Sequence, residues 1–137
     1  MLAEQSRYWE GAQVGAAEAE DLERRCNQAM ELKNQGQYDE AAAQFEHVLE
    51  CQPDHARAHL GLGLVYCFVG RFEESLEELK RAVECDPDWV DGHLNLAKTY
   101  AMLGMYEEAR VEFGRVLELH PGHPEAKKQL SYFDDLG

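Results

Sequence analysis

Apolar side chains recur along this chain with the spacing of an α-helix. Within residues 56–89 they lie three and four residues apart, first before Gly70 and then from Phe72 onward; they are Leu62, Val65, Tyr66, Leu76, Leu79, Ala82 and Val83. This period places the apolar side chains on one face of each segment, so it predicts two amphipathic helices. Gly70 is expected to end the first helix in a left-handed conformation. Pro87 ends the second, because the residue before a proline is disfavoured in the α region.

The same arrangement occurs three times, with a period of 34 residues. The matching positions hold Gly36, Gly70 and Gly104; Tyr38, Phe72 and Tyr106; Ala41, Ser75 and Ala109; and Pro53, Pro87 and Pro121. Each glycine closes a first helix, and the aromatic residue two positions later begins a second helix with a large apolar contact. Asp54 and Asp88, which follow two of the prolines, are predicted to cap the next helix. A fixed period of this size is typical of stacked helical repeats.

The period divides the chain into five parts. Residues 22–55, 56–89 and 90–123 form three repeats, and residues 124–137 form a C-terminal capping helix with one apolar and one polar face. Residues 1–21 lack the repeat and contain glycines that weaken a helix. They are predicted to form an N-terminal arm or a frayed helix, anchored by Tyr8 and Trp9.

Composition narrows the classes of partner. The 137 residues include 27 acidic and 13 basic side chains, a net charge of −14. Such a chain lacks the basic footprint that nucleic acid requires, and it does not suit an anionic membrane surface. It has no secretory signal pattern and no apolar run of about 18 residues, so we expect a cytoplasmic protein without membrane insertion. The four cysteines, Cys26, Cys51, Cys67 and Cys85, form no CxxC pair and are expected to be reduced.

The repeated residues resemble the tetratricopeptide repeat, a unit of 34 residues with a pattern of Trp, Leu, Gly and Tyr followed by Ala, Phe and Pro. The matches are Leu62, Gly63, Tyr66, Leu96, Tyr100, Ala41, Ala109, Phe45, Phe113 and the three prolines. The resemblance covers residues 22–123 fully and 124–136 in part. Arg25, His59 and His93 replace the usual Trp, and Gln28 replaces a Leu. The polar Gln28 indicates a first helix that is partly uncovered, or covered by residues 1–20 or another molecule.

The resemblance implies an all-α fold, a right-handed superhelical solenoid of antiparallel helix pairs with about seven helices. It also implies a concave groove lined by the first helix of each pair, which binds peptides without catalysis. By this analogy the peptide-binding residues are Cys26, Asn27, Met30, Arg57, Leu60, Leu64, Cys67, Phe68, Leu94, Asn95, Lys98 and Met102. All groove positions, including the cap, carry four bases and three acids, which leaves a net −15 on the rest of the chain.

Two interpretations of the apolar groove residues stay open. Leu60, Leu64 and Phe68 have the spacing of residues that pack between helices. As an exposed set they would instead form a binding surface, to which the flexible side chain of Met is well suited. We expect recognition to depend mainly on burial of these three side chains.

Two ligand-binding patterns of the family are incomplete here. Asn27 and Asn95 share a position at which some members hold a peptide backbone with an asparagine ladder, but Gly61 stands between them. A clamp for the acidic C-termini of heat-shock chaperones needs Lys and Asn, then Asn, then Lys and Arg in successive repeats. This chain has Cys26, Met30, Gly61, Asp91 and Asn95 at those positions, so we do not expect that co-chaperone role.

No catalytic or cofactor-binding pattern is recognisable. His55 and His59 are four residues apart, but His55 is expected to precede the helix and no Glu follows it as in a zinc-protease helix. The paired glutamates at 73–74, 77–78 and 107–108 are expected on solvated helix faces. We therefore expect no enzyme, no metal site and no cofactor.

The pattern and the resemblance are compatible with three hypotheses for function. The first is an adaptor or scaffold that binds an apolar segment of a partner protein. The second is self-assembly, in which the arm with Tyr8 and Trp9 enters a neighbour's groove. The third is a holding chaperone for secreted proteins, since bacterial secretion chaperones with three such repeats are also small and acidic.

Overall fold

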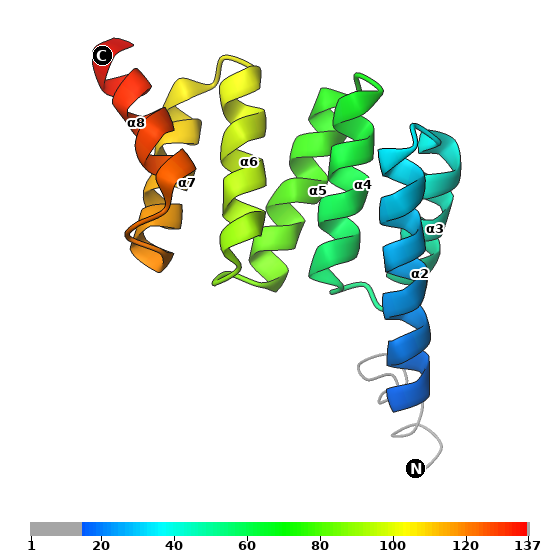
Figure 1. Ribbon diagram of the computed structural model, residues 1–137. Coiled ribbons are helices and arrows are strands. Elements are labelled where there is room, and N and C mark those ends of the chain that lie inside the picture. The colour runs from blue at the N-terminus through cyan, green and yellow to red at the C-terminus, as the bar shows by residue number, and fades with distance from the viewer. Residues whose placement is uncertain (1–14, 137) are drawn as a thin grey trace, which may run out of the picture.

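The computed structural model describes residues 15–136, with side chains up to Phe133. In the order and labels of Figure 1, the helices of this part are α2 (Ala16–Asn34), α3 (Tyr38–Cys51), α4 (Ala56–Phe68), α5 (Phe72–Cys85), α6 (Val90–Met102), α7 (Tyr106–Leu119) and α8 (Pro124–Leu136). The described residues form seven helices and no strand, which confirms the predicted all-α fold of helix pairs. Each helix packs on the next one in the chain, and α4 also contacts α2 and α6.

The first helix is longer than its counterparts. α2 has 19 residues, whereas α4 and α6 have 13 each, because α2 begins six residues before Leu22. Its N-terminal turns project beyond the stack (Figure 1). Part of the segment predicted as an arm or frayed helix is therefore the start of α2. The predicted anchors Tyr8 and Trp9 lie outside the described residues.

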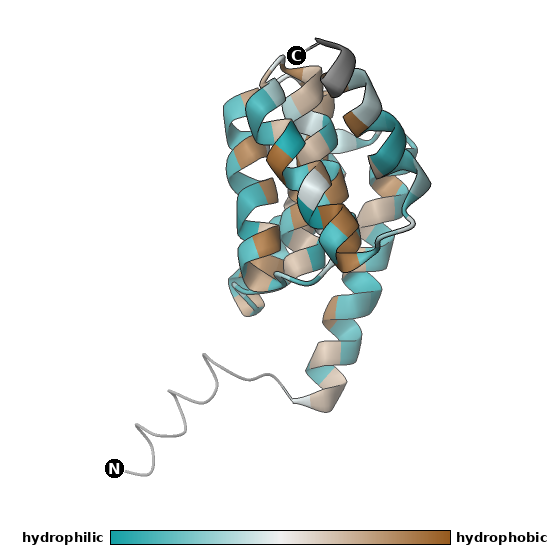
Figure 2. Cartoon of the chain, turned by 90° about the vertical axis from the view of Figure 1, so that its left-hand side faces the viewer, coloured by the Kyte–Doolittle hydropathy of each residue, from teal (hydrophilic) through white to brown (hydrophobic). Residues whose placement is uncertain are grey.

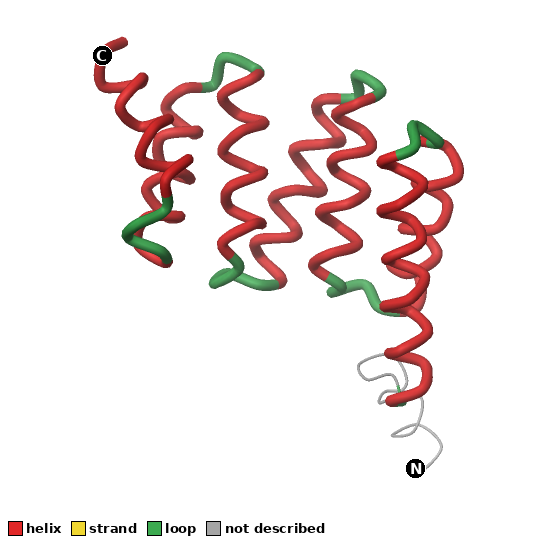
Figure 3. The backbone as a smooth tube through the Cα atoms, viewed as in Figure 1, coloured by secondary structure: helices red, strands yellow, loops and turns green. Residues whose placement is uncertain are grey.

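The three glycines end the first helix of each repeat as predicted. Gly36, Gly70 and Gly104 have φ angles of 81°, 85° and 78°, in the left-handed region that favours glycine. At the first of these turns, Gly36 N–H donates to Lys33 O at 3.0 Å and Gln37 N–H donates to Leu32 O at 2.9 Å. These two bonds form a Schellman motif, which both other turns repeat. All three turns lie at one end of the stack (Figure 3).

The turns that connect successive repeats differ from the prediction by one residue. Asp54 and Asp88 were expected as N-caps, but α4 is capped by His55 and α6 by Trp89. His55 N–H bonds Gln52 O at 3.1 Å, so Asp54 belongs to the turn itself. The capping bond of α4 comes from the imidazole, whose Nδ1 accepts from Ala58 N–H at 3.1 Å.

The core contains one large side chain of each second helix. Phe45, Leu79 and Phe113 occupy the same repeat position and are completely buried. Small residues face them: a side chain at Gly63 would contact Leu79, and Ser75 Oγ donates to Gly63 O at 2.7 Å. The helices in Figure 2 alternate between hydrophobic and hydrophilic residues, as amphipathic helices with one buried face do.

Gly61 has a packing role that the sequence did not indicate. A Cβ at this position would overlap Cζ and Cε1 of the Phe45 ring and lie 2.8 Å from Cε2. The ring has no exposed surface into which it could move. Gly61 is therefore required by the large side chain of the preceding repeat.

Polar pairs occupy the position where the family pattern has Trp. Arg25 Nη1 donates to Gln44 Oε1 at 2.8 Å, and one repeat later His59 Nδ1 bonds Glu78 Oε2 at 2.7 Å. His93 and Glu112 make the third pair, at 2.6 Å. Each pair joins the two helices of one repeat. Glu78 is thus not on a solvated face, contrary to the expectation for the glutamate pair 77–78; its side chain is only 20% exposed.

The buried His59 also binds the turn before it. Its Nε2 lies 2.7 Å from Pro53 O, so both ring nitrogens face acceptors, and His93 contacts Glu112 and Pro87 O in the same way. Burial lowers the pKa of His59, but the bonds to Glu78 and Pro53 O and the charge of Glu78 outweigh it, so the pKa is raised. The protonated ring donates to both acceptors, which fixes the turn between repeats onto α5.

The first prediction concerns Gly61. Gly61→Ala should lower the free energy of unfolding by about 1–3 kcal/mol, because the added methyl group overpacks the Phe45 ring. The matched control is Gly114→Ala in α7, where a Cβ meets nothing within 4 Å. That change should raise stability by about 0.5–1 kcal/mol through helix propensity alone. Urea unfolding of both variants checks this, and a stabilising Gly61→Ala would refute the packing role.

The second prediction concerns pH. Folding raises the pKa of His59, so protonation of this ring stabilises the folded state. The stabilisation is fully present below the pKa of the unfolded state, about 6.5, and is lost as the pH rises through the pKa of the folded state. His59→Gln should therefore cost more stability at about pH 6 than at about pH 9. Denaturant unfolding at both pH values measures the difference. An equal cost of His59→Gln at both pH values would contradict the account.

Candidate functional site

The structure places the twelve predicted groove residues at three levels of exposure. Phe68, Met102, Asn27 and Lys98 are exposed, and Met30, Arg57, Leu64, Cys67 and Asn95 are half-buried. Cys26, Leu60 and Leu94, one from each repeat, are buried. All twelve lie on α2, α4 and α6, the first helices of the repeats. Their role in binding remains a prediction.

The buried members support the surface from beneath. Leu60 and Leu94 belong to the same core cluster, against which Leu64 packs with part of its side chain. Leu60 is thus a core residue, Leu64 reaches the surface in part, and Phe68 is 60% exposed. Burial raises the pKa of Cys26 to about 11, so its thiol is protonated at neutral pH and behaves as a small apolar group.

The asparagine amides are bonded within the protein. Asn27 Oδ1 accepts from Arg57 Nη2 at 2.7 Å, and Asn95 Nδ2 donates to Asp91 O, one turn earlier in α6, at 2.8 Å. Between them, Gly61 cannot be replaced by Asn because of the Phe45 ring. Each of these bonds uses one of the several donor and acceptor positions of its amide, so it orients the amide without preventing a bond to a peptide backbone. The ladder is interrupted by Gly61 alone.

Ion pairs join neighbouring first helices across this face. Glu23 of α2 accepts from Arg57 of α4 at 2.8 Å, and its other oxygen lies 2.6 Å from His55 Nε2. Lys98 of α6 lies 3.4 Å from Glu125 of α8. The two predicted groove cations therefore already face carboxylates, which leaves the surface nearly neutral.

Exposed apolar residues gather where the first helices end. Seven large hydrophobic residues are exposed in the described part of the chain, and five of them lie at the turns inside the repeats: Phe68, Val69, Phe72, Met102 and Tyr106. The Phe68 ring stacks on Tyr38 of the preceding repeat, with the centroids 5.5 Å apart. The predicted groove contains Phe68 and Met102 but not the other three. Phe72 and Tyr106 are the aromatic residues that follow Gly70 and Gly104, where the pattern predicts a large apolar contact; both side chains are exposed.

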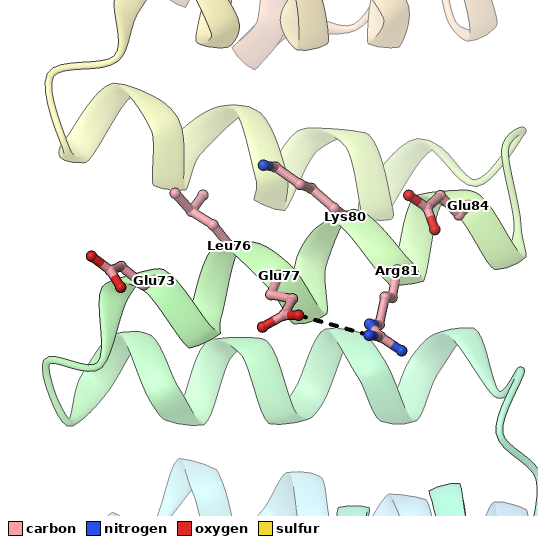
Figure 4. Close-up of a pocket in the computed structure, with 6 residues that line it drawn as sticks. All are labelled: Glu73, Leu76, Glu77, Lys80, Arg81 and Glu84. Atoms are coloured by element: carbon pink, nitrogen blue, oxygen red, sulfur yellow. Dashed lines mark ion pairs between the residues drawn. The ribbon is translucent and has the colours of Figure 1, made fainter.

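The second helices present a different surface. α3, α5 and α7 carry 13 acidic and four basic residues, whereas α4 and α6 carry one acid and two bases. A depression of about 730 Å³ lies along α5 and is lined by Glu73, Leu76, Glu77, Lys80, Arg81 and Glu84. Figure 4 shows these side chains spread along one helix, with Glu77 and Arg81 paired at 3.7 Å. This is a solvated, charged helix surface rather than an enclosed site.

Residues 15–136 contain no group of three or more His, Cys, Asp or Glu side chains arranged to hold a metal ion. None of their helices combines the length and the apolar character needed to cross a membrane.

Comparisons with known proteins agree with the repeat pattern. Two family models, both described as tetratricopeptide repeat, match residues 26–88 and 70–131. No curated protein matches the chain significantly.

Solved structures share the fold. The first tetratricopeptide repeat domain of Spaghetti (RPAP3), bound to the HSP90 peptide SRMEEVD, has a TM-score of 0.77 and 23% identity, over 90% of this chain and 95% of that one. A mutant O-GlcNAc transferase of Thermobaculum terrenum has a TM-score of 0.75 and 26% identity over 85% of this chain. This chain spans only 22% of that transferase chain. The matched models cover most of the chain between them and agree with its 34-residue period and helix pairs, so this protein belongs to the tetratricopeptide repeat family.

Proposed function

We propose that the chain is a non-catalytic interaction module that binds an apolar peptide or helical segment of a partner protein on its first helices, the predicted concave face. The observation that carries this proposal is the contrast between the two sides of the stack. The second helices are strongly acidic, while α4 and α6 are nearly neutral and carry exposed or half-exposed apolar residues.

Leu64 is the centre of the proposed contact. It lies on the middle first helix, packs on the core with one side and remains half-buried. Phe68 follows one turn later, and Met102 occupies the same position as Phe68 one repeat on. Covering the exposed part of each of these side chains would contribute less than the roughly 1.5–3 kcal/mol that full burial of such a side chain supplies.

An acidic C-terminal peptide is not the ligand we propose, although the Spaghetti domain was solved with the HSP90 peptide SRMEEVD. At the five clamp positions this chain has buried Cys26 and Gly61, half-buried Met30 and Asn95, and an exposed carboxylate, Asp91. None supplies a cation, and Asp91 would repel a second carboxylate. The apolar side chains thus support an apolar ligand better.

Self-assembly through the N-terminal arm is an alternative without a structural observation in its favour, because Tyr8 and Trp9 lie outside the described residues. Likewise, nothing in the described residues favours a holding chaperone for secreted proteins over an adaptor.

The third prediction tests the binding face. Leu64→Glu should weaken partner capture from an extract of the native cell at least about tenfold, because it places a charge in the apolar contact. The matched control is Val111→Glu on α7, which introduces the same side chain at an apolar position that is 70% exposed. It should leave capture unchanged.

Circular dichroism and thermal unfolding establish that both variants are folded. Equal capture by wild type and a folded Leu64→Glu variant would refute the proposed face. Equal loss in both variants would show that the added charge, not its location, weakens binding.

A further inference from the structure

The turns inside the repeats present a row of exposed apolar side chains. We refer to Phe68, Val69, Phe72, Met102 and Tyr106 as the turn-edge strip; their exposed fractions range from 41% for Phe72 to 60% for Phe68. Phe72 and Met102 occupy, one repeat on, the positions of the stacked Tyr38 and Phe68, so the repeat predicts that they too are neighbours. The opposite end of the stack, where repeats join, has none of the seven exposed large hydrophobic residues.

Carboxylates follow the turn inside every repeat, including the two turns that form this strip. Each second helix begins with an aromatic residue followed by two acids, and these acids are Asp39, Glu40, Glu73, Glu74, Glu107 and Glu108. Only two bases, Lys33 and Arg71, lie in the segments 33–40, 67–74 and 101–108. Arg71 is held by Glu74 at 2.6 Å and stacks on the Tyr66 ring at 4.6 Å.

The two features have different explanations within the fold. Acids in the first turn of a helix interact favourably with its dipole, so the fold alone accounts for them. Internal contacts cover the neighbouring aromatic side chains only in part. Phe68 stacks on Tyr38 at 5.5 Å and Tyr106 lies 5.7 Å from the Phe133 ring, yet Phe68 is 60% and Tyr106 is 49% exposed. A contiguous set of exposed apolar side chains marks an interaction surface, and a partner that covers this one would meet the carboxylates at the same time.

We infer that the turn-edge strip binds a basic amphipathic segment of a partner protein. The apolar side of that segment covers Phe72, Met102 and Tyr106, and its lysines or arginines lie against the carboxylates at the starts of α5 and α7. An acidic segment would be repelled by the same border, and an anionic membrane by the net charge of −14. This inference names the chemistry of the partner that the proposed function requires. It depends on one part of that function, namely that the chain binds a protein.

The fourth prediction uses a synthetic probe. A fluorescent amphipathic helix of about 18 residues, five turns long, with leucines on one face and lysines on the other, should bind the full chain. A peptide of the same pattern with glutamate in place of lysine should not bind measurably. Fluorescence anisotropy measures both affinities, and raising the salt concentration should weaken binding of the lysine peptide.

Two variants locate the probe on the protein. Phe72→Ser combined with Tyr106→Ser keeps every charge and should weaken binding at least about tenfold. Glu107→Gln combined with Glu108→Gln, at two exposed sites, should weaken it severalfold. The matched control, Glu50→Gln with Glu84→Gln, removes the same charge at the other end of the second helices and should have little effect. If the double serine variant does not fold, the glutamine pair and its control still show whether the probe binds at the turn edge.

The outcomes separate this inference from the proposed function. Loss of probe binding only in the turn-edge variants supports the strip. Loss only in Leu64→Glu overturns the strip and supports the first-helix face. The inference is overturned if the lysine peptide does not bind, or if the turn-edge and control glutamine variants lose the same affinity. Neither result bears on the proposed function, which the Leu64→Glu capture experiment tests separately.

Discussion

The packing of one large side chain from each second helix against small residues of the first helices determines the geometry of this protein. Phe45, Leu79 and Phe113 are completely buried and repeat every 34 residues. Gly61 provides the space for Phe45 and Gly63 provides it for Leu79, while the Phe113 ring packs on Phe133 of α8 at 5.8 Å. Because most contacts run between helices that follow one another in the chain, this local fit sets the position of the surface residues on the stack.

Polar interactions add a second connection between the same helices. His59 and His93 stand where the family pattern has Trp, and each links the second helix of its repeat to the turn before the first. A Trp fills this space by apolar contact, whereas an imidazole fills it with two directed hydrogen bonds. At His59, whose pKa is raised, we expect this substitution to make stability depend on pH. The helix arrangement agrees with solved structures of the family.

Much of the fold could be predicted from the sequence because it depends on local chemistry. Gly36, Gly70 and Gly104 lie in left-handed turns because backbone conformation alone requires glycine there. Gly61 could not be explained in advance, since its reason is a ring sixteen residues earlier in the chain. The proline pattern predicts N-caps at Asp54 and Asp88, but each turn is one residue longer, so the N-cap positions fall on His55 and Trp89.

The candidate site was harder to predict, because helical spacing does not distinguish a buried apolar residue from an exposed one. Leu60 and Phe68 follow the same apolar period, yet one is 6% exposed and the other 60%. The difference arises at the end of α4, where no neighbouring helix covers Phe68 beyond the ring of Tyr38. Likewise, helical spacing could not show that Asn27 accepts a hydrogen bond from Arg57 of the next repeat.

The central claim is that recognition occurs on the first helices and at the turns that follow them, and that the outer faces of the acidic second helices stay in contact with solvent. Backbone amide chemical shifts of the isotope-labelled protein, followed during titration with the captured partner, test this claim most directly. The account predicts perturbations in α4, in α6 and in the turns around Gly70 and Gly104. Perturbations confined to the outer residues of α3, α5 and α7, such as Glu46, Lys80 and Val111, would contradict it.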